Sequence, residues 1–358
     1  MEIKISESPI KGKVLYADTS NIYYYFKGKI IIADSKYEKI KTFYVPAPFW
    51  MKVLTKIRII ERFFHNDVRW AYLTSKKELI FSCRKGIYKY TVSNGLIVKE
   101  EVPVKGRPLS FCAVKNIKNL CEGIIIGDYT LNDQNEEVNA FFRSEESGEW
   151  KKLFTFPAGS VRHIHKIFCK ENNLYVLTGD MDSQSGIWKV SDDFKSLRPI
   201  LVGKQIYRSC QILDIKDKEE FFYLTDSPDE INHIISLKNG TIHKENEIRG
   251  TCIYGEKIGE NLIFSTTVEP SSERKNIFKY WLSNSPGKGI KDKNFEINIL
   301  FCNGEIKKVA EFHHDGLPLR LFQYANATFS YGGKDFIYFT VQCCKKSDQK
   351  VFKVEFLK

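Results

Sequence analysis

The feature that most constrains this chain is a repeated set of four short runs rich in Val, Ile, Phe and Tyr. One complete set is RHIHKIF, NLYVLTGD, GIWKVS and LRPILVG, between residues 162 and 203. Runs of this length, bounded by Gly, Asn, Asp or Ser and almost free of helical spacing, are typical of β-strands. Sets in the same order occupy residues 13–45, 68–102, 108–156 and 207–247, and a sixth opens after residue 249 with GTCIYGEKI, NLIFSTTVE and KYWLS.

The last set is incomplete in a way that predicts how the chain closes. LRLFQYANATF, DFIYFTVQCC and KVFKVEFLK supply three strands before the chain ends, and EIKISES, residues 2–8, is a spare strand at the other end. A terminal strand that completes the last sheet removes an exposed edge, which is how β-propellers close. We therefore expect an all-β fold, a single β-propeller over residues 1–358 with seven four-stranded blades, six being the alternative because residues 249–317 are irregular. FWMKVLTKIRIIERFF, residues 49–64, interrupts the repeat and predicts an insertion, with some helical character, at about residues 46–65.

Composition narrows the class of partner. The formal net charge of +11 favours an anionic partner, although a generally Lys-rich background explains much of it. No basic stripe with interleaved aromatic residues is present, so we expect no nucleic-acid partner. No apolar run is long enough to span a bilayer, so we expect no membrane partner either. The nine cysteines have no metal-binding spacing and the N-terminus has no apolar leader, which together predict reduced thiols and a cytoplasmic location. The oligomeric state is not predicted.

Charged residues recur at equivalent places in the repeats. Arginines stand at the start of the first run of six sets: Arg69, Arg107, Arg162, Arg208, Arg249 and Arg320. At the end of the second run stand Arg84, Asp128, Asp180, Asp226 and Glu269. In a propeller these two positions lie on the same rim, where ligands usually bind. Guanidinium groups suit carboxylate ligands because their planar fork donates paired hydrogen bonds, although the same pattern would arise if each Arg only held neighbouring blades together.

Two histidines fall in the same region. His163 and His165 are two residues apart in a predicted strand, so their side chains project to one face. With Asp180 and Gln205 they could hold a divalent cation, or they could serve as proton donor or substrate ligand. We favour the second interpretation on sequence grounds, because no spacing enforces coordination. The expected cofactor is therefore none, with a divalent cation as the alternative.

Two segments between third and fourth runs, SEESGEW at 144–150 and SDDFKSL at 191–197, resemble the Asp-box of sialidase-like (BNR-repeat) propellers. Both are degenerate copies of Ser-x-Asp-x-Gly-x-Thr-Trp. Residues 106–232 also resemble microbial propellers described as glycosyl-hydrolase-like. The resemblance implies three arginines gripping a substrate carboxylate, which Arg162, Arg208 and Arg320 match in type. It also implies a tyrosine nucleophile, for which Tyr207, Tyr254 and Tyr324 compete.

The sequence thus supports three hypotheses about function. The leading one is a glycoside hydrolase acting on an acidic sugar, in which Arg162, Arg208 and Arg320 bind the anion, assisted by Arg107, Gln205 and Tyr207. Asp180 and Asp226 would then be the catalytic acid and base, with His163 and His165 at the site and Asp128 or Glu269 assisting. The second hypothesis is a metal-assisted polysaccharide lyase, in which His163, His165 and Gln205 hold the cation. The third is a propeller that binds a glycan or a protein without catalysis.

Overall fold

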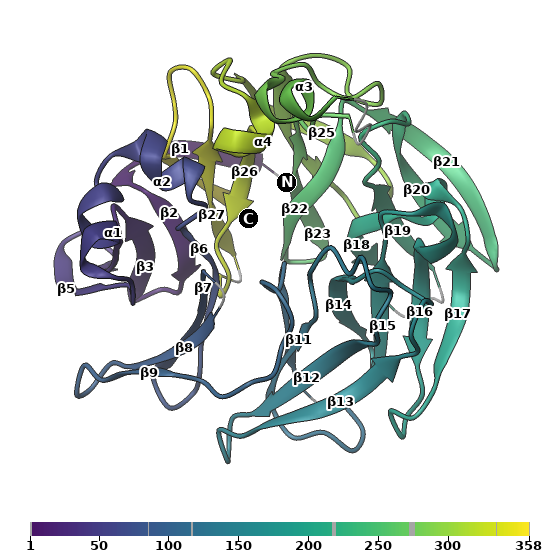
Figure 1. Cartoon of the computed structure of the whole chain (residues 1–358), viewed down its shortest axis with the longest axis horizontal. Helices are drawn as coiled ribbons and strands as arrows, with labels where there is room; N and C mark the ends of the chain where they lie inside the picture. Colours follow the sequence, from purple (N-terminus) through teal and green to yellow (C-terminus); the bar gives the residue numbers. More distant parts are fainter. Residues whose placement is uncertain are drawn as a thin grey trace. The chain divides into compact units, whose positions relative to one another are not determined.

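The structure is a computed structural model that describes residues 2–84, 86–115, 117–216, 220–271, 276–333 and 335–357. It contains seven antiparallel sheets of four strands each, which are the blades of a β-propeller (Figure 1). The seven-bladed prediction is confirmed. The chain divides into two compact units, residues 1–68 with 211–358 and residues 69–210. They are called unit 1 and unit 2 below, and each is described by itself.

Unit 2 is one continuous stretch that contains three sheets. Their strands are β6 (Val68–Leu73), β7 (Glu78–Cys83), β8 (Gly86–Thr91), β9 (Ile97–Lys99), β10 (Phe111–Val114), β11 (Gly123–Gly127), β12 (Val138–Ser144), β13 (Trp150–Phe156), β14 (Ile164–Lys170), β15 (Asn173–Thr178), β16 (Gly186–Val190) and β17 (Leu197–Val202). Two short 3-10 helices, η1 (Asp182–Gln184) and η2 (Gln205–Tyr207), flank β16 and β17. The alternating apolar residues of the last two sheets pack into one core that includes Ile125, Phe142 and Val176.

Unit 1 holds the other four sheets. Their strands are β1 (Glu2–Lys11), β2 (Lys13–Ala17), β3 (Asn21–Phe26), β4 (Lys29–Asp34), β5 (Lys39–Tyr44), β18 (Ser209–Asp214, starting in unit 2), β19 (Phe221–Thr225), β20 (Asn232–Lys238), β21 (Thr241–Ile248), β22 (Thr251–Ile258), β23 (Asn261–Thr267), β24 (Asn294–Leu300), β25 (Ile306–His313), β26 (Asn326–Phe329), β27 (Phe336–Gln342) and β28 (Lys350–Leu357). A large core includes Phe295, Ile297 and Phe339.

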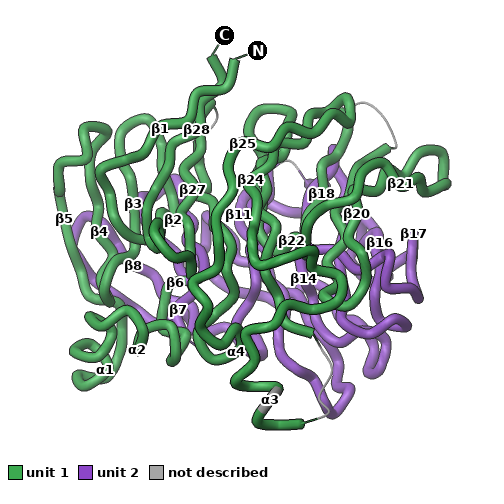
Figure 2. The backbone as a smooth tube through the Cα atoms, turned by 90° about the horizontal axis from the view of Figure 1, so that it is seen from above, with its two compact units in different colours: residues 1–68, 211–358 green, residues 69–210 purple. Residues whose placement is uncertain are grey.

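The first strand completes the last sheet, as the sequence predicts. The order of that sheet is β1-β28-β27-β26, and β1 pairs with β28 from Glu2 opposite Leu357 to Glu7 opposite Phe352. The two ends of the chain therefore leave the fold side by side (Figure 2). Ile10, near the end of β1, is buried. This closure covers the edge of β28 that would otherwise expose unpaired backbone groups.

Four short helices lie in unit 1: α1 (Phe49–Leu54), α2 (Arg58–Phe63), α3 (Ile277–Leu282) and α4 (Leu319–Phe322). The first two form the expected helical insertion. The other two correct the sequence analysis. KYWLS was expected to be a strand but lies largely in α3, and the third strand of that sheet is β24. LRLFQYANATF begins as α4, directly after Pro318, so Arg320 lies on a helix and not at the start of a strand. Proline favours a first helical turn because its ring presets φ. Within the described residues, no helix is long and apolar enough to cross a membrane.

Candidate functional site

The candidate site lies in unit 2, on the sheet β14–β17 and the loops beside it. His163 precedes β14, and His165 lies within it at a β-bulge, where the register shifts between Ile164 and Lys166. Asp180 follows β15 in the loop 179–185. The structure brings these three side chains together. Each imidazole Nε2 lies 3.5 Å from an oxygen of the Asp180 carboxylate, and the two Nε2 atoms are 3.0 Å apart.

Backbone carbonyl groups fix the orientation of both imidazole rings. Nδ1 of His163 lies 2.8 Å from the carbonyl oxygen of Thr130, and Nδ1 of His165 lies 3.0 Å from that of Ser209. A carbonyl oxygen can only accept, so each Nδ1 carries the hydrogen in these bonds. In a neutral imidazole the other nitrogen is then bare. Both Nε2 lone pairs therefore point toward the same small region beside Asp180, with the ring of Tyr129 centred 4.3 Å from that of His163.

Gly179 allows this convergence. A Cβ at residue 179 would lie 2.4 Å from Cε1 of His165 and 2.9 Å from Cγ of Arg208, which is closer than any real contact. Asp180 itself has a φ of 89°, a strained value for a residue with a side chain. The Gly-Asp pair at the start of GDMDSQSG thus does two things: glycine makes room for the imidazole, and the strained backbone directs the carboxylate toward it.

Two arginines contact the same carboxylate. Nη2 of Arg208 lies 3.2 Å from Asp180 Oδ1, and Nη1 of Arg162 lies 3.6 Å from Asp180 Oδ2. Arg162 is held in place by the carbonyl oxygen of Leu131, to which its Nε donates at 2.6 Å. Gln205 does not join the cluster through its amide nitrogen, which donates to the Asp180 carbonyl oxygen and to Asp182 Oδ1, each at 2.8 Å. Gln205 therefore stabilises the loop.

The electrostatics of the cluster favour an ionised Asp180 and a neutral His163. Burial alone would raise the pKa of Asp180, but its contacts with His163 and His165 and the charge of Arg208 hold that pKa well below its usual range. Burial lowers the pKa of His163, because desolvation penalises the imidazolium. Two guanidinium groups and one carboxylate leave a surplus of positive charge, so the cluster suits an anionic ligand.

The three ligand atoms have the geometry of a metal centre. Two bare nitrogens 3.0 Å apart repel each other unless a positive charge lies between them, either a proton on one ring or a metal ion. A tetrahedral ion with bonds of about 2.0–2.1 Å separates its ligand atoms by about 3.3 Å. The two Nε2 atoms are 3.0 Å apart, that of His163 lies 3.5 Å from Oδ2 of Asp180 and that of His165 lies 3.5 Å from Oδ1, so these separations are close to that value. Metal-binding histidines also usually donate their second nitrogen to a carbonyl group, as both do here. His163, His165 and Asp180 therefore fit a divalent cation.

The other predicted site residues occupy different environments. Asp128 is buried, and its two oxygens accept from the backbone nitrogens of Lys105 at 2.6 Å and Asn139 at 2.8 Å, so it stabilises its own loop. The Arg107 carbonyl oxygen accepts from the Arg69 side chain at 2.7 Å. Tyr207 ends η2, next to Arg208.

The remaining predicted residues belong to unit 1. The guanidinium carbon of Arg320 lies 3.8 Å from the ring centre of Tyr280. Asp226 is buried directly after β19, and Glu269 follows β23. Arg249 pairs with Glu296 at 3.1 Å and also with Asp292, which is an ion-pair network within one sheet. Arg162 and Arg208 therefore meet Asp180 within unit 2, whereas the convergence of Arg320 and Asp226 on the same site stays a prediction.

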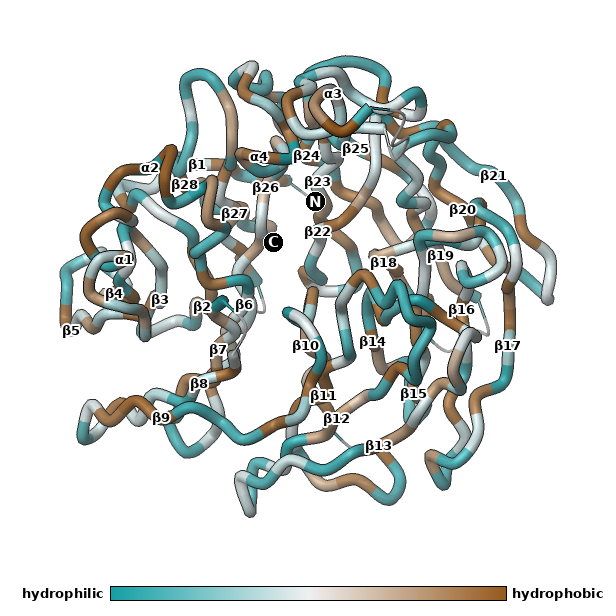
Figure 3. The backbone as a smooth tube through the Cα atoms, in the orientation of Figure 1, coloured by the Kyte–Doolittle hydropathy of each residue, from teal (hydrophilic) through white to brown (hydrophobic). Residues whose placement is uncertain are grey.

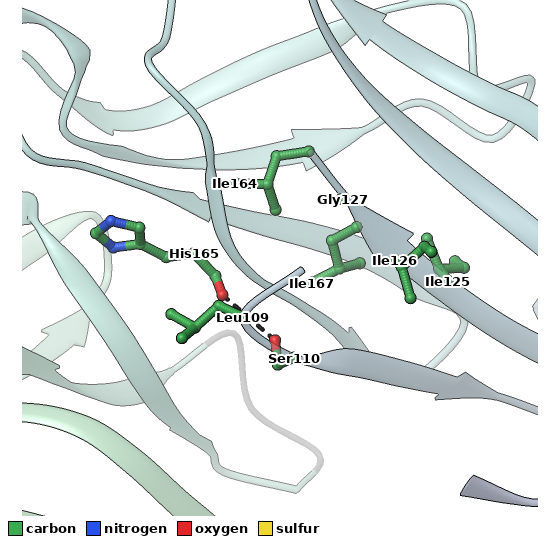
Figure 4. A pocket seen from close by; sticks show the side chains of 8 residues that line it. All are labelled: Leu109, Ser110, Ile125, Ile126, Gly127, Ile164, His165 and Ile167. Atoms are coloured by element: carbon green, nitrogen blue, oxygen red, sulfur yellow. Dashed lines mark hydrogen bonds between the residues drawn. The ribbon is translucent and has the colours of Figure 1, made fainter. Parts of the chain in front are cut away.

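A small pocket adjoins the cluster but is not a ligand site. It is lined by Leu109, Ser110, Gly127 and His165 together with four isoleucines of β11 and β14, and Ser110 donates to the His165 carbonyl oxygen at 3.3 Å. In Figure 4 the His165 ring points away from the aliphatic side chains. The pocket is packing space beside the backbone of His165.

Comparison with known proteins shows the fold and no family. No protein-family model matches the chain, and no curated protein matches it in sequence. The chain is similar to a chain in the crystal structure of the mitotic checkpoint complex, with 8% identity, 99% of this chain and 91% of that chain covered, and a TM-score of 0.56. It is also similar to a chain of a nidogen/laminin complex (12% identity, 87% and 95% covered, TM-score 0.46) and to the Dos1 propeller (9% identity, 94% and 75% covered, TM-score 0.47). At 8% identity, the first of these likenesses indicates a shared fold and no activity.

Proposed function

We propose that His163, His165 and Asp180 bind a divalent cation, and that the protein is a carbohydrate-active enzyme that cleaves an acidic glycan by elimination. The observation that carries the proposal is the orientation of the two imidazoles. Both Nδ1 atoms donate to carbonyl oxygens, so both Nε2 atoms face the carboxylate of Asp180 and can act as ligands once they give up any proton they share with it. Sequence alone favoured the histidines as proton donors or substrate ligands, but a buried pair of anchored imidazoles beside a carboxylate is better suited to coordination.

The substrate class follows from the charge of the cluster. Arg162 and Arg208 lie beside the carboxylate of Asp180, and a bound cation would add to the positive charge they contribute. A carboxylate-bearing sugar supplies the compensating anion, and guanidinium groups bind it through paired hydrogen bonds. A divalent cation at this position would withdraw charge from the sugar carboxylate and so acidify the adjacent C–H bond. Transfer of that proton to water, formation of a C=C bond and departure of the glycosidic oxygen from the next carbon, with uptake of a proton from water by that oxygen, would together be an elimination.

Hydrolysis by a pair of carboxylates is less well supported by the same cluster. A glycoside hydrolase needs one carboxyl group that stays protonated and a second that is ionised. Among the described residues of unit 2, the cluster contains one carboxylate, Asp180, and its lowered pKa makes it a poor acid. The sialidase-like reaction implied by the Asp-box resemblance would also need a tyrosine nucleophile at the cluster, and the ring of Tyr129 packs against that of His163 at an angle of 41°.

The test has a binding arm and a catalytic arm. Titration of chelator-treated protein with Mn²⁺ or Zn²⁺ should show one site, which His163→Ala and Asp180→Asn remove. Asp182→Asn is the matched control because Asp182 lies in the same loop and contacts Gln205. A panel of polyuronates should then give a product with the ultraviolet absorbance of a double bond conjugated to a carboxylate, and chelator should abolish it.

The outcomes separate the three hypotheses. New reducing ends without that absorbance, formed equally well after chelation, would establish hydrolysis and contradict the proposal. Binding of acidic oligosaccharides with no turnover would identify a glycan-binding propeller. Absence of cation binding in the titration would remove the metal centre, whatever the activity.

A further inference from the structure

The helical insertion in unit 1 reverses the burial pattern of an ordinary surface helix. A helix at a protein surface normally buries its apolar side and exposes its charged side. In α2 the buried residues are Glu61 and Arg62, while Ile59 and Phe63 are exposed. Segment 46–65 is therefore not held in place by an apolar core contact alone.

Ion pairs hold the polar side of α2 against the protein. Arg58 donates from Nε to Asp348 at 2.9 Å and from Nη1 to Glu61 at 2.8 Å. Glu61 in turn accepts from the Tyr25 hydroxyl at 2.7 Å. Arg62 pairs with Asp315 and donates to the Phe322 carbonyl oxygen at 2.6 Å. Buried, multiply bonded charges of this kind fix a segment in one orientation, because moving it would leave charges without partners.

The fixed orientation turns large apolar side chains toward solvent. Phe49 is 82% exposed and Phe278, on α3, is 75% exposed. The full set, called the apolar edge below, comprises Phe49, Trp50, Val53, Ile57, Ile59, Phe63, Phe64, Ile277, Phe278, Trp281 and Leu282. The helices α1, α2, α4 and α3 follow the same edge of unit 1 in Figure 2, and α1, α2 and α3 carry hydrophobic colouring in Figure 3. α4 links the two parts, since the rings of Phe63 and Phe322 lie 6.0 Å apart. Exposed apolar surface of this extent marks an interaction site.

The charges beside the apolar edge identify its partner. Segment 46–65 contains one acidic residue, Glu61, which is buried, so its exposed surface carries no carboxylate. Its accessible charges are basic: Lys56 is exposed, and Lys52 is half-buried with its Nζ 5.8 Å from the ring centre of Tyr44. Tryptophan, phenylalanine and aliphatic side chains next to lysines are the pattern of proteins that lie in the membrane interface and contact anionic headgroups.

We propose that the apolar edge docks the protein on an anionic lipid bilayer, with α1 and α3 inserted among the headgroups and Lys52 and Lys56 contacting phosphate or carboxylate groups. The sequence analysis expected no membrane partner because no run is long enough to span a bilayer. Interfacial binding needs only exposed side chains on short helices, so that argument does not apply to it. This inference is independent of the proposed chemistry of the histidine cluster.

The probe is sedimentation of the full chain with phosphatidylcholine vesicles that contain or lack phosphatidylserine. We expect binding to the anionic vesicles, weakened by added salt, with a blue shift of tryptophan fluorescence from Trp50 and Trp281. Each of Phe49→Ser and Phe278→Ser should weaken binding by about ten-fold, the factor expected for an apolar side chain that no longer leaves water. Lys56→Glu should weaken binding to the anionic vesicles only.

The matched control is Leu96→Ser, because Leu96 is 55% exposed and lies outside the apolar edge. An unchanged melting curve shows that a variant folds. Failure of the natural protein to sediment with anionic vesicles, or equal loss of binding in the control, would overturn the proposal. A self-association that Phe49→Ser abolishes, without any vesicle binding, would show that a second copy covers the edge instead.

Discussion

Replacing Gly179 by alanine tests how the site is built. The added methyl group would lie 2.4 Å from Cε1 of His165, whereas ordinary carbon contacts need about 3.5 Å. The imidazole, the loop or both must therefore move by about 1 Å. Gly179 has no left-handed φ, so the substitution adds a steric conflict without backbone strain.

The expected size of the effect follows from that displacement. Overpacking a well-filled interior costs about 1–3 kcal/mol, so Gly179→Ala should lower the free energy of unfolding by this amount. Displacing His165 from its carbonyl partner should weaken cation binding by about 10–100-fold, the range found when the groups that orient metal ligands are disturbed. Urea unfolding followed by circular dichroism measures the first quantity, and calorimetric titration with Mn²⁺ measures the second.

A double-mutant cycle tests whether the His165 ring causes the destabilisation by Gly179→Ala. In the His165→Ala background the ring is gone and the remaining close atom is Cγ of Arg208, part of a flexible side chain. Gly179→Ala should then cost less than about 1 kcal/mol. Equal destabilisation in both backgrounds would refute the view that Gly179 is there to admit the imidazole.

Four further predictions follow from other contacts. Deleting residues 1–9 should lower the free energy of unfolding by about 2–4 kcal/mol, because β28 loses its partner strand; an unchanged urea midpoint would contradict this. Arg58→Leu should cost about 3 kcal/mol, because it leaves the buried Glu61 and the half-buried Asp348 without their cation, again measured by urea unfolding. A cost below about 1 kcal/mol would show that the pairs are not needed. The pKa of His163 is lowered in the folded protein, and that of His314 is lowered to about 4. The unfolded chain therefore binds more protons, and the free energy of unfolding, measured with urea, should fall as the pH drops from 6.5 toward 4. A flat pH profile would argue against neutral His163 and His314. Gln205→Ala should weaken cation affinity less than Asp180→Asn does, since Gln205 holds only the loop, and the reverse order in the same titration would make Gln205 a ligand.

The strand repeat could be predicted from sequence because sheet patterning is local. Alternating apolar residues and turn residues define most strands, and the missing fourth strand indicated β1 as its replacement. Two short apolar runs were assigned incorrectly. KYWLS and the start of LRLFQYANATF carry no clear period, and in runs this short an apolar composition is equally compatible with helix and strand. Both form helices in unit 1, and α3 leaves its apolar side chains exposed.

The candidate site was predictable only where it depended on spacing. The one-residue gap between His163 and His165 placed both on one face, and equivalent positions in the repeats predicted that Arg162, Arg208 and Arg320 would converge with Asp180 and Asp226. Arg162, Arg208 and Asp180 do meet within unit 2. The anchoring of the two rings could not be inferred, because the carbonyl groups of Thr130 and Ser209 come from other parts of the chain and any residue type supplies them. Tyr129 and Gly179 were also missed as site residues. Glycine beside aspartate was a usable signal at residue 179, but it is equally common in ordinary turns.

The pairing of β1 with β28 has a consequence for the order of events during synthesis. Unit 2 is one uninterrupted stretch, so the contacts of His163, His165 and Asp180 with Thr130, Arg162, Arg208 and Ser209 become available once residue 210 has left the ribosome. Strand β1, by contrast, is made long before its partner β28, residues 350–357. Its hydrogen-bonding edge must wait until β28 has been made, and such contacts between distant parts of a chain form slowly. Nascent chains stalled before residue 350 should therefore contain a histidine cluster but an unpaired first strand, and should depend most on chaperones at that stage.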